Sequence, residues 1–486
     1  MKINCVKLIL LVPAMAAALG YSSAALAMDE FQVAPSQIPD RTFRLTDFGA
    51  VGDGKTINTQ AFAKAIAAAS AAGGGQLIVP KGEFLTGPIV LASHIDLHLE
   101  DGAKIQFPTT WATYAQALPA PGATTDAGAA QNTEPGAARG RGGFGGIPAL
   151  IYGNNVTDVA VSGSGSIDGG GQLFWGAIVA QREAAAAARG RGQPAPATVP
   201  AAPAVGEFAA VRQRVGKPKI IVLQNAKRVR LAGVAVTNSP GFHVAPTRCE
   251  DVLIDGLRIT APHNSPNTDA LDPTSCNRVI IRNCLLDAGD DNVAIKTVVG
   301  YPSFPTQNIL IENCTCLHGH GISMGSETYG GIQHVLVRNC TFDGGDQAIR
   351  IKSARDRGNT LSDFTFSNIQ MKNIAKTAIS INLYYSNPQA QKARVVEPLT
   401  ASTPHLSGIH IDHVTGIACN RACDVIGLPE SPVEDVTFTD VSVEANTGAV
   451  IADVKHLVFK NVSFKVKKGE PLTVSHAEDS LLTVTP

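Results

Sequence analysis

A recurring hydrophobic pattern constrains the fold of this chain more than any other feature of the sequence. In each copy an aliphatic residue or Phe alternates with other residues, and a polar or small residue then precedes a second hydrophobic alternation. Such alternation is typical of a half-buried β-strand. The copies follow one another at intervals of 21 to 30 residues, with one interval of 45. They begin at Val229, Val252, Val279, Ile309, Val335, Phe364, Ile409, Val436 and Leu457.

Repeats of this length predict a solenoid, in which each coil buries its apolar side only when neighbouring coils stack on it. Earlier copies begin at Val159 and Ile95. We therefore expect an all-β chain folded as a right-handed parallel β-helix of about ten coils, from about residue 75 to the C-terminus. The Ala-rich residues 59–72 would form a short helix, with Phe62 on its apolar face, that caps the open N-terminal end.

The composition fits this fold and argues against some classes of partner. Of the 486 residues, 47 are Gly and only 5% are aromatic, which favours strands and turns over helices. A chain of this length would ordinarily form several domains, but a stack of repeats grows along one axis, so we expect a single, monomeric domain over residues 28–486. The net charge of −1 gives no reason to expect a nucleic-acid partner. An acidic polymer would have to be captured by a local basic site.

The first 27 residues have the pattern of a signal peptide. Lys2 and Lys7 form a basic segment, residues 8–19 an apolar core, and residues 25–27 a cleavage site of small residues. The apolar core is too short to span a bilayer. We therefore expect export to the periplasm or beyond, with a mature chain that begins near Met28 and contains no membrane span.

Two stretches interrupt the repeats. Residues 117–146 are rich in Ala, Gly and Pro, and residues 177–206 contain a run of alanines and several prolines. Both have the composition of low-complexity loop insertions. Each also contains an Arg-Gly-Arg sequence that could contact an acidic polymer, although a solvated loop is the simpler interpretation.

The repeat register also explains residues that could be mistaken for functional ones. Asparagines recur at one position, where stacked side chains would bond to the backbone and to each other. Cysteines recur at the next position and are expected to be free, buried side chains. These residues are Asn283, Asn313, Asn339, Asn368 and Asn461, and Cys284, Cys314 and Cys340.

The even number of cysteines that follow the signal peptide raises the possibility of disulfide bonds. Cys249 and Cys276 match in register, so they could form either a bond or a second ladder. Cys419 and Cys423, in the loop-like sequence Cys-Asn-Arg-Ala-Cys, are the best candidates for a bridge.

Three short sequences after consecutive repeats share one frame, in which an ionisable residue is followed by a small or polar residue and an aliphatic one. They begin at Asp269, Asp291 and His320. Because they are one coil apart, we expect their side chains to stack about 4.8 Å from one another. Sequence spacing alone therefore predicts a line of ionisable groups along one side of the solenoid.

Further charged residues belong to the same patch. Asp290 lies beside Asp291, and Arg350 and Lys352 share one face of the following strand. Carboxylates this close disfavour joint ionisation, so one should have a raised pKa, suited to a general acid, while another stays ionised. Glycoside hydrolysis uses such a pair, and the two cations would suit a substrate carboxylate. A structural polar ladder or a calcium site is the alternative, although His320 and the two cations argue against a cation site.

At this point the sequence resembles glycoside hydrolase family 28, the polygalacturonases, and in particular its bacterial members. One tripeptide would be weak support, but all four signatures of the family occur in order, each about one coil apart. They are Asn-Thr-Asp at 267–269, Asp-Asp at 290–291, Gly-His-Gly at 319–321 and Arg-Ile-Lys at 350–352. Further similarities at 47–54, 86–88 and 163–169 extend the resemblance over about residues 43–390.

The resemblance implies hydrolysis of the α-1,4 bonds of galacturonan with inversion and without a covalent intermediate. Asp290 would be the general acid, and Asp269 and Asp291 would hold and activate the attacking water. His320 would support the protonation and position of the acid. No cofactor or metal is expected.

The resemblance also implies how the substrate is bound. Arg350 and Lys352 would bind the galacturonate carboxylate on the leaving-group side, and Asn267 would line the cleft. Tyr385 would contact substrate, with its neighbour Tyr384 as the alternative. Ala270 replaces the Gly that is common after the first Asp, a mild departure.

Other functions remain open. They are hydrolysis of a related pectic polymer such as rhamnogalacturonan, exo-acting galacturonosidase activity, a calcium-dependent pectate lyase, and a non-catalytic β-helix binding protein. The intact Asp290-Asp291 pair with Arg350 and Lys352 favours plain galacturonan, because an acidic sugar needs cationic partners. The two insertions leave endo and exo action open, since they could block part of the cleft.

Overall fold

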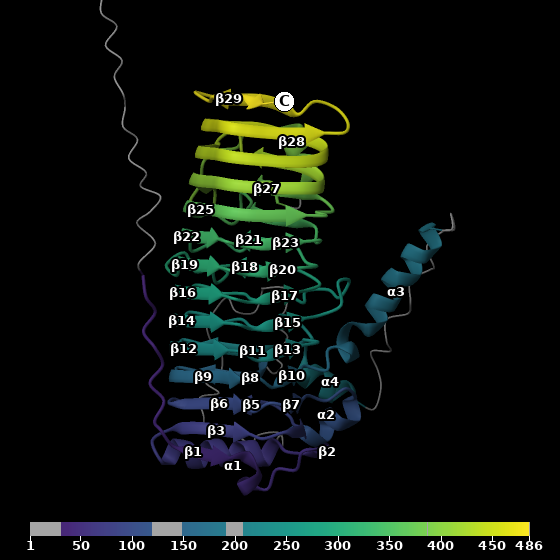
Figure 1. Cartoon of the computed structure of the whole chain (residues 1–486), viewed down its shortest axis with the longest axis vertical. Helices are drawn as coiled ribbons and strands as arrows, with labels where there is room; N and C mark the ends of the chain where they lie inside the picture. Colours follow the sequence, from purple (N-terminus) through teal and green to yellow (C-terminus); the bar gives the residue numbers. More distant parts are fainter. Residues whose placement is uncertain (1–30, 119–147, 191–207, 386, 486) are drawn as a thin grey trace, which may run out of the picture.

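The computed structural model describes residues 31–118, 148–190, 208–385 and 387–485. These residues form a long parallel β-helix whose coils stack along one axis (Figure 1). The predicted signal peptide lies outside the described residues. Within the described ranges, none of the helices is both long and apolar enough to cross a bilayer.

Parallel strands stack into three ladders, which form the faces of the β-helix. The first ladder consists of β1 (Thr42–Arg44), β3 (Gly75–Val79), β6 (Ile95–Leu99), β9 (Thr157–Gly163), β12 (Lys227–Ala232), β14 (Glu250–Asp255), β16 (Asn277–Arg282), β19 (Thr306–Glu312), β22 (Ile332–Arg338), β25 (Asn359–Lys372), β27 (Pro404–Ile426) and β28 (Val433–Val466). The second adds β2 (Asp53–Ile57), β4 (Gly82–Leu85), β7 (Ala103–Gln106), β10 (Ser166–Asp168), β13 (Ala235–Thr237), β15 (Arg258–Thr260), β17 (Leu285–Asp287), β20 (Thr315–Cys316), β23 (Thr341–Asp343) and β30 (Val484–Thr485).

The third ladder carries the polar residues that the sequence singled out. It consists of β5 (Ile89–Val90), β8 (Ala149–Asn154), β11 (Lys219–Gln224), β18 (Val293–Ile295), β21 (Ile322–Met324), β24 (Gln347–Lys352), β26 (Thr377–Asn382) and β29 (Leu472–Glu478). Single bridges at Val244 and Leu271 continue it between β11 and β18. The long strands β25, β27 and β28 turn corners and contribute to more than one ladder.

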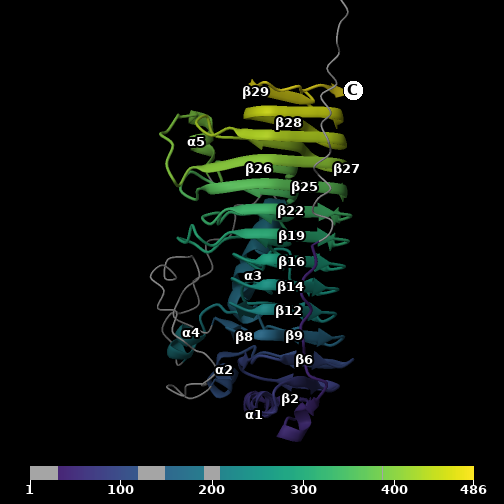
Figure 2. The same ribbon diagram turned by 90° about the vertical axis from the view of Figure 1, so that its left-hand side faces the viewer.

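The pairing confirms the register that the sequence predicted. Each predicted repeat start from Val159 to Ile409 is the Cα partner of the next one, up to Val436. The stack begins earlier than expected, since β1 at Thr42 already pairs with β3. The long interval before Ile409 contains a loop with helix α5 (Pro388–Ala393), which projects from the side of the stack (Figure 2).

Helices cover the N-terminal end and flank the stack. Helix α1 (Thr59–Ala71) is the predicted cap; it follows the 3-10 helix η2 (Leu45–Phe48) and buries Phe62 against the first coils. Helix α2 (Trp111–Ala117) precedes the first predicted insertion, most of which lies outside the described residues.

The prediction of a loop over residues 177–206 is wrong for its first part. Residues 177–190 belong to helix α3 (Gln172–Gly190), which projects from the stack in Figure 1. The alanine run explains the difference, because Ala has the highest helix propensity of the amino acids. Residues 191–206 lie outside the described residues, and α4 (Ala209–Val215) follows them.

The asparagine ladder is structural, as predicted. All of its members have φ between 53° and 56°, the left-handed conformation that Asn tolerates better than most residues. Asn368 donates to Asn339 at 2.7 Å, and Asn461 donates to Asp440 at 2.6 Å. These side chains turn a corner of each coil and bond to the coil next to it.

The cysteines of the described residues are free and buried, including all three of the predicted ladder. Cys249 and Cys276 do not form a disulfide bond with each other; Cys276 Sγ instead accepts a hydrogen bond from the backbone N–H of Cys249 at 3.4 Å. The predicted Cys419–Cys423 bridge is wrong, because both residues lie within strand β27 rather than in a loop. Four residues of extended chain span about 13 Å, whereas a disulfide needs Cα atoms within about 7 Å.

Candidate active site

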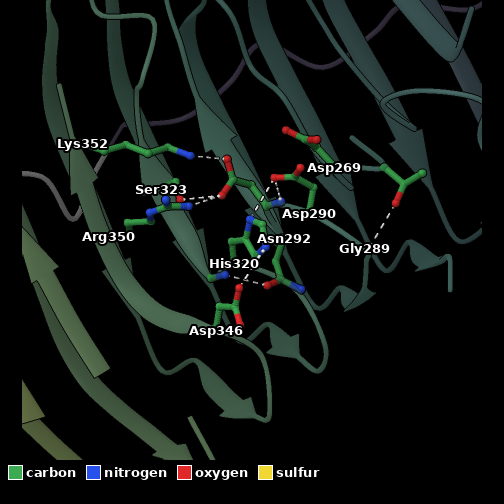
Figure 3. Close-up of polar contacts among 12 residues, drawn as sticks. Asp269, Gly289, Asp290, Asn292, His320, Ser323, Asp346, Arg350 and Lys352 are labelled. Atoms are coloured by element: carbon green, nitrogen blue, oxygen red, sulfur yellow. Dashed lines mark hydrogen bonds and ion pairs between the residues drawn. The ribbon is translucent and has the colours of Figure 1, made fainter. Parts of the chain in front are cut away.

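The candidate active site lies where the chain enters the third ladder in four consecutive coils. Leu271 pairs with Val293, Val293 with Ile322, and Ile322 with Ile349. Residues two positions before these partners therefore share one register, which places Asp269, Asp291 and His320 on successive coils. The close-up in Figure 3 shows the resulting cluster, in which the side chains converge as the sequence predicted.

The Gly-His-Gly sequence is required by close packing around His320. Gly319 has φ +137°, and a Cβ there would lie 2.5 Å from Asn292 Oδ1. A Cβ on Gly321 would lie 2.3 Å from the Ala348 carbonyl oxygen. Asn292 Oδ1 also accepts the Gly321 N–H at 3.0 Å. The two glycines thus allow the imidazole to be held between the preceding and the following coil.

His320 joins two carboxylates. Its Nδ1 lies 3.0 Å from Asp290 Oδ1, and its Nε2 lies 3.2 Å from Asp346 Oδ2. Burial lowers the pKa of His320, but the hydrogen bonds to Asp290 and Asp346 outweigh it and raise the pKa to about 9. Burial would raise the pKa of Asp290, yet the bond to His320 brings it below its ordinary value.

Asp291 is held by the predicted pair of cations. Lys352 Nζ lies 2.6 Å from Asp291 Oδ2, and Arg350 Nη1 lies 3.2 Å from Oδ1. Ser323 Oγ donates to Oδ1 at 2.9 Å. Burial raises the pKa of Asp291, but the Lys352 and Arg350 charges outweigh burial and lower it. Arg350 and Lys352 flank the buried Ile351 on β24, as strand alternation predicted.

Asp269 is buried and belongs to a second charged group. Lys296 Nζ lies 3.0 Å from Asp269 Oδ2 and 2.6 Å from Asp272 Oδ1. The second oxygen of each carboxylate, Asp269 Oδ1 and Asp272 Oδ2, has no hydrogen-bond partner among the described residues. Lys296 also lies over the Phe242 ring at 4.1 Å. One buried ammonium therefore serves two buried carboxylates.

The direction of the pKa shifts corrects one expectation. Burial raises the pKa of Asp269 well above its ordinary value, although Lys296 opposes the rise. The sequence predicted one carboxylate with a raised pKa among ionised neighbours, and the general acid, Asp290, was expected to be that carboxylate. Asp290 instead has a lowered pKa, because His320 bonds to it directly.

The remaining predicted residues lie at the edges of the cluster. Asn267 is exposed two residues before Asp269, and within the described ranges no contact joins its side chain to the charged groups. The Tyr385 ring lies 5.8 Å from the Arg350 guanidinium and 5.6 Å from Lys352 Nζ. Tyr384 is buried, and its ring lies under Arg355 at 5.2 Å. Of the two tyrosines, Tyr385 is therefore the one beside the predicted cations.

A pocket of about 330 Å³ opens beside this edge of the cluster. It is lined by Arg350, Lys352, Ser380, Asn382, Tyr385 and Gln391, among others. The lining combines two cations, hydroxyl and amide groups and one aromatic ring, which is the chemistry of a site for an acidic sugar.

The inserted helix α3 is tied to the loop before Asp269. Arg182 donates to the Asn264 carbonyl oxygen at 2.7 Å, and Asn264 Nδ2 donates to Glu183 Oε1 at 3.1 Å. The helical part of the insertion therefore lies beside the loop that leads into Asp269.

Several site residues were not predicted from the sequence. Lys296 and Asp272 form the buried group around Asp269, Ser323 bonds to Asp291, and Asp346 and Lys376 continue the contacts of His320. Asp346 could have been found, because it directly precedes the segment that continues the repeat frame at Gln347. Nothing in the sequence marked Lys296, whose long side chain reaches into the site from the far end of β18.

The cluster could also be interpreted as a metal site. Donor atoms of Asp290, Asp291 and His320 lie within 4.8 Å of one another. However, Arg350 and Lys352 already bond to Asp291, and the raised pKa of His320 makes it a cation as well. A divalent cation would meet three positive groups here, which favours the hydrolase interpretation over a calcium site.

Comparisons with known proteins agree with this geometry. The sequence model of the family described as glycosyl hydrolases family 28 matches residues 207–468. A probable polygalacturonase of Vitis vinifera is 30% identical over 414 residues, which are 82% of this chain and 73% of the relative. An endo-polygalacturonase of Pectobacterium carotovorum subsp. carotovorum is 28% identical over 62% of this chain and 65% of its own length.

Solved structures show the same architecture. A hyperthermoactive exopolygalacturonase from Thermotoga maritima superimposes with a TM-score of 0.70 at 27% identity, covering 89% of this chain and 94% of that one. A polygalacturonase from Erwinia carotovora ssp. carotovora superimposes with a TM-score of 0.58 at 22% identity, over 92% of this chain and all of that one. The second likeness supports the fold alone.

Proposed function

The chain belongs to glycoside hydrolase family 28 and is a pectin-degrading glycosidase, and we propose that it is exported and hydrolyses the α-1,4-galacturonosidic bonds of galacturonan with inversion. The observation that carries this proposal is the arrangement of Arg350 and Lys352 on one face of β24, beside Asp290 and Asp291. Two fixed cations adjoin two carboxylates, as the hydrolysis of an acidic sugar requires.

Asp290 acts as the general acid in the proposed reaction. In the free site, one proton lies between Asp290 and His320 and rests on the imidazole, since the pKa of His320 is raised and that of Asp290 is lowered. The Nδ1–Oδ1 distance of 3.0 Å allows the proton to pass to Asp290. An uncharged leaving oxygen placed against Asp290 favours the protonated acid over the carboxylate, and Asp290 then donates the proton to that oxygen.

Asp269 and Asp291 hold the attacking water on the other side of the bond. Asp291 is ionised because Lys352 and Arg350 lower its pKa, so it can accept a water proton. Asp269 can serve as the base only when it is ionised, which the Lys296 charge favours against the effect of burial. Water attack opposite the leaving oxygen gives inversion.

Arg350, Lys352 and Tyr385 bind the sugar on the leaving-group side. When the substrate carboxylate reaches the cations, it competes with Asp291 for their hydrogen bonds. The Tyr385 ring lies beside both cations and offers an apolar face to the sugar. Asn267 lines the cleft from its exposed position before Asp269.

Product analysis on polygalacturonate tests the function. We expect new reducing ends, saturated products that still form in the presence of a chelator, and the β-anomer as the first product by NMR. Asp290→Asn should abolish product formation, whereas Asp287→Asn, on the same coil but paired with the exposed His318, should not. Unsaturated products that need calcium would indicate a lyase, and binding without new reducing ends a non-catalytic protein.

The same experiment separates the finer alternatives. Galacturonate monomer as the sole product would indicate exo action, and mixed oligomers would indicate endo action. A higher rate on rhamnogalacturonan than on polygalacturonate would contradict the proposed substrate. Export is tested by the N-terminus of the mature protein, which should begin near Met28.

A further inference from the structure

His320 makes a second ion pair that the proposed reaction does not use. Its Nε2 faces Asp346, and Lys376 Nζ lies 2.7 Å from the same oxygen, Asp346 Oδ2. Asp290, His320, Asp346 and Lys376 thus form a row of alternating charge that leads from the acid to an exposed ammonium (Figure 3 shows its first three members).

The backbone fixes Asp346 in this row. The Asp346 N–H donates to the Gly319 carbonyl oxygen at 2.7 Å, and the Asp346 carbonyl accepts from the Lys376 N–H at 2.9 Å. Asp346 therefore belongs to the coil after His320 and is bonded to the residue directly before it. These backbone bonds fix the main chain of Asp346 beside His320, and the ion pairs with His320 and Lys376 hold its carboxylate next to Nε2.

A histidine that passes a proton to Asp290 must release it from the correct nitrogen. The imidazolium carries protons on both Nδ1 and Nε2. Loss of the Nδ1 proton to Asp290 leaves a neutral ring with Nε2–H, whereas loss of the Nε2 proton leaves Asp290 ionised and inactive. A carboxylate that accepts from Nε2 stabilises the first neutral form.

We propose that Asp346 is a positioning residue for the reaction: it holds a proton on His320 Nε2, so that the proton released is the one on Nδ1, which points at Asp290. The proton balance is simple. Asp290 gains the Nδ1 proton and loses it to the leaving oxygen, and His320 regains one from solvent. This inference rests on the proposed role of Asp290 as the acid.

The charged groups around His320 set the expected pH dependence. Asp290 and Asp291 face it from the preceding coil and Asp346 from the following coil, and all three stabilise the imidazolium. Lys376 acts through Asp346, whose pKa burial would raise but His320 and Lys376 lower to about 2. Lys352 acts through Asp290. Removing the charge of Asp346 should therefore lower the pKa of His320, whereas removing the charge of Lys376 should raise it.

Two variants of the full chain test the proposal with opposite predictions. Asp346→Asn should move the alkaline limb of kcat/KM to lower pH by about one unit. Lys376→Met should move it to higher pH by a few tenths of a unit. Matched controls come from the neighbouring ion pair, where Lys372 Nζ lies 3.0 Å from Asp343 Oδ2. Asp343→Asn and Lys372→Met should leave the limb in place.

The tautomer of His320 gives a readout that does not depend on catalysis. In ¹⁵N NMR above pH 9, the neutral ring of the wild-type chain should carry its proton on Nε2, and Asp346→Ala should move it to Nδ1, because Asp290 is then the carboxylate that still bonds to the ring. An unshifted limb in Asp346→Asn, shifts of the same sign in both variants, or an Nδ1–H ring in the wild type would overturn the proposal. Failure of the proposed function would be seen differently, as an active Asp290→Asn enzyme or no hydrolysis at all.

Discussion

The two charged groups of the site use the same residue types in opposite ways. On the acid side, Asp290, His320, Asp346 and Lys376 alternate in sign along a row that reaches solvent. On the base side, Lys296 lies between two buried carboxylates, those of Asp269 and Asp272. The Asp290 and Asp346 side chains are 23% and 26% exposed, whereas those of Asp269 and Asp272 are 4% and 0% exposed.

This difference explains why the pKa shifts of the aspartates have opposite signs. Each acid-side carboxylate has a cation of its own nearby, and the pKa values of Asp290 and Asp346 fall despite burial. The base-side carboxylates both bond to Lys296, and burial raises the pKa of both Asp269 and Asp272. The number of bonded cations and the access to solvent therefore differ between identical side chains: the acid-side carboxylates are partly exposed, and the base-side carboxylates are buried.

Removing the general acid of the acid side should give the largest effect on activity. Asp290→Asn keeps the shape of the side chain but cannot donate a proton from a carboxyl group. We expect kcat/KM on polygalacturonate to fall by roughly 10³-fold, within the range of general acid catalysis. Initial rates of reducing-end formation measure it, and a loss of less than about tenfold would contradict the assignment.

Removing the shared cation should affect stability on the base side. Lys296→Met removes the ammonium that bonds directly to the buried carboxylates of Asp269 and Asp272, and breaking a buried ion pair in this way costs about 3–5 kcal/mol. Chemical denaturation of the variant measures the free energy of unfolding.

A second substitution serves as the control for this experiment. Lys296→Met combined with Asp272→Asn removes one of the two stranded charges, so it should recover part of the lost stability. If the double variant were no more stable than Lys296→Met alone, Asp272 would not share the Lys296 charge.

On the acid side, protonation of His320 should make the free energy of unfolding depend on pH. The pKa of His320 is about 9 when folded and 6.5 in the reference state. A raised pKa stabilises the fold fully below pH 6.5, and this contribution is lost as pH rises through 9. We expect a decrease of roughly 2 kcal/mol after allowing for solvent screening. Unfolding curves at pH 6 and pH 9.5 measure it; in His320→Gln this decrease should be absent.

The smallest expected effect lies between the two sides, at the cations of β24. Tyr385→Ala removes the ring beside Arg350 and Lys352 and with it the proposed apolar contact with the sugar; a loss of about 1 kcal/mol of apolar burial should raise KM by about fivefold. Tyr384→Phe, which keeps the buried ring, is the control and should leave KM unchanged. A KM that stays unchanged in Tyr385→Ala would contradict the proposed contact of this ring with the sugar.

Periodicity predicted the part of the site that depends on backbone register. Asp269, Asp291 and His320 could be aligned from their spacing, because parallel coils place equivalent residues above one another. Alternation placed Arg350 and Lys352 on one face for the same reason. The same periodicity identified the Asn and Cys ladders as structural.

The rest depends on properties that spacing does not contain. Lys296 reaches Asp269 and Asp272 through a long flexible side chain, whose direction a period does not specify. The direction of a pKa shift needs distances and burial, so the sequence could not show that Asp290 would be paired with a charged imidazole. The helix over residues 177–190 was missed because its alanines were interpreted by composition rather than by helix propensity.

The parallel register of the coils has a consequence for how such a gene can change length. Insertion of one residue within a strand reverses the direction of every later side chain in it. Insertion of a whole coil preserves those directions, but between β18 and β21 it would move His320 one strand spacing, about 4.8 Å, away from Asp290. The coils between Asp269 and Lys352 are therefore fixed in number by chemistry. Those before and after them can multiply, and corners can lengthen, as α3 and the α5 loop already show.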